Sequence, residues 1–213
     1  MAAASVSHPV ASRPRLASRT LGVLAIAIGL TVGASTSSLQ AHLGSPWASL
    51  VNAASPWLTP AFLLGLLAAR PRPAAVIGLV VCLSELIGYY VTAELRGFPA
   101  GHGILVFWGA CAVLGGPIFG GAGWAARHGP ARFAGLAAAT VPAAFLAEAV
   151  VAYGIRLHYG SSAALFAAIG FAAATVAAFR SRRPELVAIG LVPVFALGVL
   201  AELALGVVYA QTF

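Results

Sequence analysis

Long apolar stretches, each close to the length that crosses a lipid bilayer, follow one another along almost the whole chain. A membrane-spanning helix needs about twenty predominantly apolar residues, and the polar segments between these stretches are too short for a second folded domain. The sequence therefore predicts an all-α integral membrane bundle of about seven transmembrane helices. We expect a cytoplasmic tail at residues 1–19 and one polytopic helical domain at residues 20–213. The expected helices cover residues 21–38, 55–69, 74–93, 104–126, 133–155, 163–179 and 186–210.

The composition agrees with lipid as the main solvent of the protein surface. Of the 213 residues, 61% are hydrophobic and only 8% are charged, whereas about a quarter of the residues in a typical soluble domain are charged. A soluble fold of this size would leave most of its exterior apolar. The lipid bilayer is therefore the first partner that the sequence predicts.

The distribution of arginine predicts the orientation in the membrane. All twelve Lys or Arg positions are arginine; ten lie in segments that face the cytoplasm if the N-terminus does, and two, Arg96 and Arg156, lie in outer segments. Because cytoplasmic loops carry an excess of basic residues, we expect a cytoplasmic N-terminus in the cell membrane. No stretch interleaves aromatic and basic residues, so a nucleic-acid partner is not expected. The expected inside arginines are Arg13, Arg15, Arg19, Arg70, Arg72, Arg127, Arg132, Arg180, Arg182 and Arg183.

The first apolar stretch has a second interpretation. The arginines of residues 13–19 precede an apolar run that ends in Val32-Gly33-Ala34, small residues that resemble a signal-peptide cleavage site. Cleavage there would leave six crossings with the same orientation. The interpretation as a retained first helix and the interpretation as a signal peptide both remain open at this stage.

The inside loops suggest an internal repeat. Arginine and proline mark each of them, and each is followed by an apolar helix that contains one glutamate: Glu85, Glu148 and Glu202. Internal repeats are common in transporter folds, so the pattern suggests one helix followed by three hairpins of like orientation. Chance is the alternative, because helices rich in alanine and leucine resemble one another and the arginines are expected from topology alone.

The three glutamates are the candidate site for binding a substrate or a proton. Charged carboxylates inside a membrane are costly and avoid lipid, and no arginine lies within an expected span. The expected partners are therefore tyrosine hydroxyls, Ser84, Thr92 or another glutamate. Tyr89 follows Glu85 by four residues and shares its helix face. Tyr153 follows Glu148 by five residues and is expected well off that face.

Two interpretations of the glutamates lead to two classes of function. If they share a polar cavity open to the outside, the protein is a transporter or permease-like component for a small solute or cation, coupled to protons through the carboxyl groups. If each is hydrated separately near the outer interface, a non-transporting accessory protein that packs against a membrane protein partner is the better hypothesis. A substrate-capturing subunit of a larger importer lies between the two.

Enzymatic chemistry is not expected. The chain has no Gly-rich phosphate loop, no metalloprotease helix and no nucleophile elbow. The outer loops hold His42, His102 and His158, but their spacing matches no ligand motif, so we expect neither a metal nor a cofactor. Cys82 and Cys111 lie inside apolar runs and are expected to be buried hydrophobic residues.

A cluster of glycine and proline marks the fourth stretch. Gly115-Gly116-Pro117 lies in its middle, and more glycines follow at positions 120, 121 and 123. The cluster is typical of a broken helix that lines a substrate site or of a kinked helix with close neighbours.

Three short motifs carry a resemblance to a known family. They are the stretch from Asn52 to Trp57, the step Gly88-Tyr89-Tyr90 and Gly115-Gly116-Pro117. Together they resemble an uncharacterised family of actinobacterial multi-pass membrane proteins, which is carried as a domain of unknown function. The resemblance implies a membrane-embedded fold over most of the chain after residue 20, and it implies no activity.

Overall fold

The computed structural model describes residues 18–181 and 183–212, which form helices and no strand. Most of the predicted tail, with Arg13 and Arg15, and Arg182 lie outside the described residues. The helices, in chain order, are α1 (Ser18–Leu39), the 3-10 helix η1 (Trp47–Ser49), α2 (Ala54–Gly65), α3 (Pro71–Leu95), α4 (His102–His128), α5 (Ala131–Ala138), α6 (Thr140–Ala147), the π-helix η2 (Glu148–Arg156), α7 (Gly160–Arg180) and α8 (Pro184–Thr212).

Six helical segments of the described chain are long and apolar enough to cross a membrane: α1, α3, α4, α5 to η2 taken together, α7 and α8. The protein is accordingly a multi-pass helical membrane bundle. The second expected stretch, 55–69, differs from the prediction because α2 has only 12 residues. At ~1.5 Å per residue it covers about 18 Å, well short of the roughly 30 Å hydrocarbon core. The bundle thus contains six long segments and one short one.

Non-helical backbone precedes α2 inside the bundle. Between α1 and α2 the chain forms turns and the single turn η1, and Ser49, Val51 and Ala53 in this loop are buried. At the other end of α2, a turn leads directly to Pro71, which begins α3 and whose fixed φ suits the first position of a helix. The short helix therefore starts within the protein rather than at its surface.

The segment from α5 to η2 is interrupted where one continuous helix, 133–155, was expected. Pro142 has no N–H to donate to the carbonyl of Ala138, and its ring crowds that carbonyl. The α-helix accordingly ends at Ala138 and resumes at Thr140. From Glu148 onward the turns widen to the π-helix η2. The sequence did not predict this widening.

The Gly- and Pro-rich cluster lies in a continuous helix. α4 runs unbroken from His102 to His128 with Pro117 inside it. The interpretation of this stretch as a broken helix is therefore wrong. Its glycines instead permit close packing: Gly116 lies against Gly78 of α3, and Gly120 lies against Ala74. A side chain at Gly116 or Gly120 would collide with the α3 backbone.

Contacts between helices show that successive segments alternate in direction. Gly29 of α1 faces Val81 of α3, and Gly33 faces Tyr89 one turn further on, so α1 and α3 run parallel. Gly78 meets Gly116, while the earlier Ala74 meets the later Gly120, so α3 and α4 run antiparallel. The same kind of contact shows that α2 runs parallel to α4. It also shows that α8 runs parallel to α5, α6 and η2. α7 runs antiparallel to these helices.

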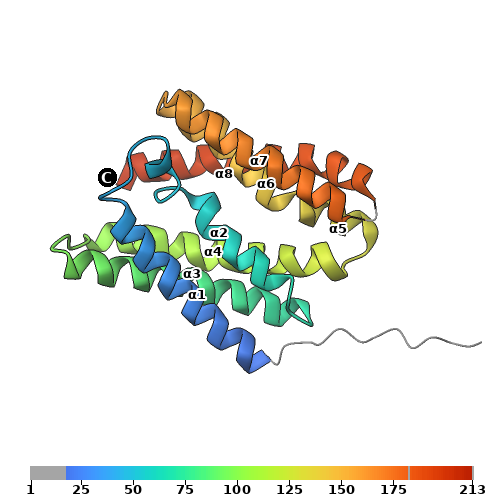
Figure 1. Ribbon diagram of the computed structural model, residues 1–213, viewed down its shortest axis with the longest axis horizontal. Helices are drawn as coiled ribbons and strands as arrows, with labels where there is room; N and C mark the ends of the chain where they lie inside the picture. Colours follow the sequence, from blue (N-terminus) through green and yellow to red (C-terminus); the bar gives the residue numbers. More distant parts are fainter. Residues whose placement is uncertain (1–17, 182, 213) are drawn as a thin grey trace, which may run out of the picture.

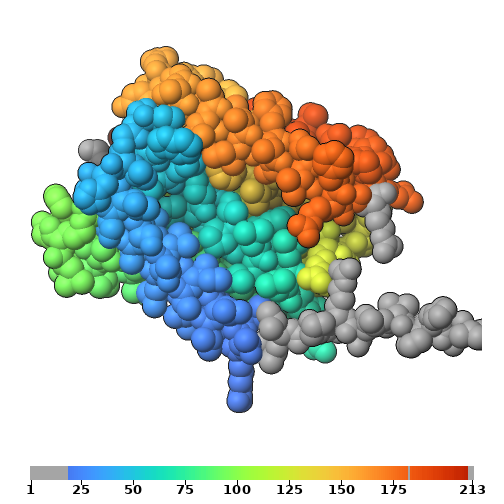
Figure 2. All heavy atoms as spheres, viewed as in Figure 1, coloured from blue at the N-terminus to red at the C-terminus, as the bar shows by residue number. Residues whose placement is uncertain are grey.

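The helices form two groups, with α2 between them (Figure 1). α3 packs mainly on α1 and α4, and α5 to η2 pack mainly on α7 and α8, while α2 contacts α3, α4 and α6. In the space-filling view, α2 is visible between α1 and α7 (Figure 2). The three hairpins suggested by the sequence are unequal, because the first contains a 12-residue helix and the second contains the π-helix.

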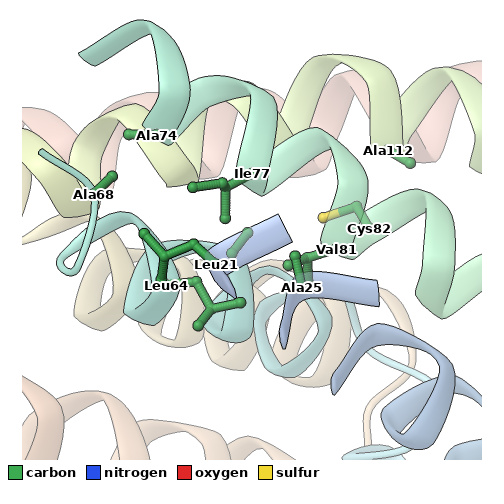
Figure 3. Close-up of a cluster of buried hydrophobic side chains, with 10 residues drawn as sticks. Leu21, Ala25, Leu64, Ala68, Ala74, Ile77, Val81, Cys82 and Ala112 are labelled. Carbon is green, nitrogen blue, oxygen red and sulfur yellow. The ribbon is translucent and has the colours of Figure 1, made fainter. Parts of the chain in front are cut away.

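Two hydrophobic clusters accompany the two groups. The first joins α1, α2, α3 and α4 through small and branched side chains, among them Leu21, Ile77 and Val81 (Figure 3). Cys82 and Ala112 belong to it. Cys82 is buried, as the sequence predicted, whereas Cys111 is only partly buried. The second cluster gathers the aromatic side chains Phe62, Phe145, Tyr153 and Phe166, with Ala53 and three other residues. They come from α2, the loop before it, and the group of α6, η2 and α7.

Candidate functional site

The first turn of α2 has free backbone donors and no local cap. The first N–H groups of any helix lack an intrahelical acceptor, and Ala53, the N-cap residue, has no side-chain oxygen to offer. Ser55 is buried, so water does not reach this turn freely. In a bilayer such groups must find a partner within the protein, because each unsatisfied one costs several kcal/mol.

Glu148, at the start of η2, supplies the missing acceptors. Its Oε1 accepts a hydrogen bond from the backbone N–H of Ala54 at 2.7 Å, and its Oε2 accepts one from the N–H of Ser55 at 3.0 Å. The hydroxyl of Ser55 also donates to Oε2. A carboxylate at the positive end of a helix is favoured electrostatically as well. Glu148, only 5% exposed, therefore caps a helix 94 residues earlier in the chain.

Buried hydroxyl groups hold the loop before α2 to the same group of helices. Tyr153 donates its hydroxyl to the carbonyl of Ser49 at 3.1 Å, and the hydroxyls of Ser49 and Ser162 share a hydrogen bond of 2.7 Å. The expectation that Tyr153 lies off the face of Glu148 is wrong. It assumed an α-helix, whereas η2 is a π-helix, in which hydrogen bonds join residues five apart.

Glu202, on α8, lies near Glu148. It is half-buried, and it interacts electrostatically with Glu148 and with Arg156. The guanidinium of Arg156 reaches back from the end of η2 and packs over Gly206, one turn after Glu202. The structure therefore brings two of the three predicted glutamates together and adds an arginine that the sequence placed outside the spans.

Glu85 lies apart from this pair. It belongs to α3, at the contact with α1, and it is 0% exposed. Within residues 18–181 and 183–212, neither carboxyl oxygen of Glu85 has a hydrogen-bond partner. A single cavity shared by all three glutamates is thus not what the described contacts show.

Tyr89 lies near the C-terminal end of α3, beside the loop that precedes α2. Its hydroxyl donates to Gln40 Oε1 at 2.8 Å, and the amide of Gln40 donates to Asn52 Oδ1 at 2.6 Å. Its ring also packs edge-on against Trp57, with ring centroids 5.4 Å apart. Tyr89 therefore connects α3 to the loop before α2, and its hydroxyl bonds to Gln40 rather than to Glu85. Among the described residues no group of three His, Cys or acidic side chains could hold a metal ion.

Comparison with known families adds one finding. Residues 12–211 match a family of unknown function, DUF6518. The chain belongs to this family. The match confirms the resemblance to an uncharacterised family that the three motifs predicted. The first motif, 52–57, contains the start of α2, and Tyr89 of the second and Gly115 of the third contact α2. No curated protein and no solved structure matches the chain. DUF6518 therefore carries no known activity to this site.

The partners of Glu148 are the residues that sequence reasoning missed. Two of its three donors are backbone N–H groups, which have no signature in side-chain chemistry. The available signals were indirect: an alanine at position 53 where a helix needs a capping side chain, and the Ser55-Pro56 pair that marks a helix start. Ser49, Ser55 and Ser162 are the buried hydroxyls that complete the candidate site.

Proposed function

We propose that this protein is a transporter or permease-like component of the cell membrane, for a small solute or cation, in which Glu148 and Glu202 couple movement to protons. The observation that carries the proposal is the bond between the Glu148 carboxylate and the first turn of α2. Broken or short helices whose ends meet charged groups in mid-membrane are the usual substrate and ion sites of transporters.

The proposed topology has seven crossings, with α2 and its flanking turns making the second. The alternating directions of the segments place the start of α1, the start of α3 and the end of α4 at one end of the bundle. The arginines of those ends, Arg19, Arg70 and Arg127, then share one face, as they do in the inside loops of membrane proteins. This face is the cytoplasmic one, which leaves residue 212 on the opposite side.

Protonation of Glu148 is the proposed coupling step. As a carboxylate it offers two acceptor oxygens to Ala54 and Ser55, whereas a protonated carboxyl carries an O–H donor on one of them. Adding the proton therefore weakens the hold on α2, which lies between the two helix groups. Glu202 and Arg156 set the local charge that governs this step. Release of α2 would let the two groups move relative to each other, which is how alternating access works.

Proton flux in reconstituted vesicles tests the proposal. The purified protein is placed in liposomes that contain a pH-sensitive dye, and a panel of small organic cations, amino acids and metal cations is added outside. We expect one class to drive proton movement in the wild type, and we expect Glu148→Gln to abolish it. Glu94→Gln is the matched control, because Glu94 is exposed. Wild-type vesicles that move no protons with any class would contradict the proposal.

A non-transporting accessory role is the second candidate, and α8 favours it. Little of α8 is buried, and Leu197 and Leu200 are 65% and 61% exposed. A helix so open to its surroundings suits packing against a membrane protein partner as well as against lipid. A photo-crosslinking side chain at Leu200 distinguishes the two: a single protein adduct in native membranes supports the accessory role, and lipid adducts alone oppose it.

A further inference from the structure

Glu85 is a buried acidic group that the proposed coupling step does not use. It is the second-largest side chain among those that are fully buried, after Phe166. Both of its carboxyl oxygens are without a hydrogen-bond partner in the described part of the chain. Most buried polar groups of proteins are paired, so an unpaired carboxyl at this depth needs a physical explanation.

At Glu85 the helices α1 and α3 pack closely against each other. Gly29 and Gly33 of α1 press against the backbone of α3, and a Cβ at Gly33 would collide with the carbonyl oxygen of Glu85. The apolar side chains of Ala25 and Val81 are fully buried nearby, in the cluster of Figure 3. A bound metal or organic cation would need several oxygen ligands or a cage, and the contact between α1 and α3 offers neither.

Within residues 18–181 and 183–212, no basic residue is found facing this carboxyl group. α1 has Arg19 as its one charged residue, in its first turn, and α2 has no ionisable residue. α4 contributes Cys111 in its middle and charged or ionisable groups only at its two ends. On α3 itself, Cys82 is the neighbour that interacts electrostatically with Glu85. An unpaired charge in such a place is far more costly than a neutral group, so a carboxyl there becomes neutral by binding a proton.

Polar groups lead from Glu85 toward the outer end of the bundle and not toward the inner end. Tyr89 lies one turn outward on the same helix face, and its hydroxyl continues through Gln40 to Asn52, which is exposed. One turn inward the face of α3 carries Val81 and then Ile77, both apolar and buried. We propose that Glu85 is a proton-binding site, separate from Glu148, which exchanges its proton with the outer face through the hydroxyl of Tyr89.

Infrared spectroscopy of the full-length protein in lipid vesicles tests the site directly. The spectrum of Glu85→Gln is subtracted from that of the wild type near neutral pH, so that the difference isolates the Glu85 carboxyl. We expect the C=O stretch of a protonated acid. The antisymmetric stretch of a carboxylate at Glu85 would overturn the proposal. If Glu85→Gln does not fold, Glu85→Met, of similar length and apolar, is the reference; failure of both would show that folding needs the charge, and would also overturn it.

Exchange into D₂O tests the route. We expect Tyr89→Phe to slow deuterium uptake at the Glu85 carboxyl about tenfold, the factor that a barrier increase of about 1.4 kcal/mol produces. Tyr90→Phe is the matched control, because Tyr90 adjoins Tyr89 but lies at the next position around the helix, and its exchange should match that of the wild type. Equal rates in all three proteins would overturn the route. Neither experiment measures transport, so each result is independent of the role proposed for Glu148.

Discussion

Glu148 and Glu85 are almost equally buried, with 5% and 0% of their surface exposed, but their surroundings differ completely. Glu148 accepts three hydrogen bonds from α2, whereas the described residues give Glu85 none. The difference follows from continuity of the backbone. Around Glu85 the helices α1, α3 and α4 are unbroken, so their N–H groups are used internally. Around Glu148 the chain starts a new helix, which leaves free donors.

The comparison suggests a general reason for where an ionised carboxylate can reside in this bundle. A bilayer supplies no donors, so the protein must supply them, and a continuous helix has none to spare. The loop before α2 and the start of α2 supply both N–H and hydroxyl donors in the second hydrophobic cluster. The glycine-lined contact of α1 with α3 supplies close packing instead. One region is thus held by hydrogen bonds and the other by backbone contact.

Glu148→Ala should have the largest effect on stability. It leaves the N–H groups of Ala54 and Ser55 and the Ser55 hydroxyl without their acceptor, at a cost of about 1–3 kcal/mol for each buried group. Some relaxation of α2 reduces the sum, so we expect a loss of about 3–5 kcal/mol. The measurement is unfolding in mixed micelles, with the exposed Glu94→Ala as control. Equal stability of the two variants would show that Glu148 does not hold α2.

Sequence reasoning predicted the long helices well, because the apolar lengths and arginine clusters follow directly from the physics of the bilayer. It failed where contacts between helices determine the length or the conformation of a helix. The stretch 55–69 is apolar enough for a longer helix, yet α2 ends at Gly65. η2, which widens from Glu148 onward, places the Tyr153 hydroxyl against the carbonyl of Ser49, far away in the sequence.

The candidate site was predicted only in part, for a related reason. Hydropathy identified Glu85, Glu148 and Glu202 as exceptional, because a carboxyl inside an apolar run stands out. Which of them come together depends on the order in which helices pack, and α8 lies beside α5 to η2 rather than beside α3. Two of the three donors to Glu148 are main-chain N–H groups, which cannot be recognised from the type of residue in the sequence.

Gly33→Ala tests the other side of the comparison. The added methyl group would strike the Glu85 carbonyl and force α1 away from α3, and overpacking of this kind typically costs about 1–3 kcal/mol. Gly22→Ala on the same helix is the control, since nothing lies within 4 Å of a Cβ there; it should be neutral or slightly stabilising because alanine favours helix. Unfolding curves that show equal losses for both variants would mean that close packing does not hold α1.

Ser55→Ala should have a smaller effect than either. It removes one of the three donors to Glu148 and leaves both backbone N–H groups in place. A single hydrogen bond to a charged group contributes about 1.5–3 kcal/mol. Glu148 Oε2 would still accept the hydrogen bond from the Ser55 N–H, which reduces the loss. We therefore expect a loss of about 1 kcal/mol, measured by thermal unfolding in detergent beside Thr59→Ala, whose hydroxyl bonds within α2 to the carbonyl of Ser55. A loss as large as that of Glu148→Ala would mean that the Ser55 hydroxyl, and not the two N–H groups, provides the stability of the contact with Glu148.

The smallest effect comes from two adjacent serines that hold the loop before α2 to the start of α7. Ser162 is buried and bonds to Ser49 at 2.7 Å, whereas Ser161 is exposed and lies 3.3 Å from Ser45. A buried hydrogen bond contributes about 0.5–1.5 kcal/mol, while an exposed hydroxyl exchanges its partner for water at no net cost. Ser162→Ala should therefore lower the unfolding free energy by about 0.5 kcal/mol, and Ser161→Ala should leave it unchanged. If both substitutions prove silent, the two serine contacts do not fix the loop, and Glu148 and Tyr153 would have to position α2.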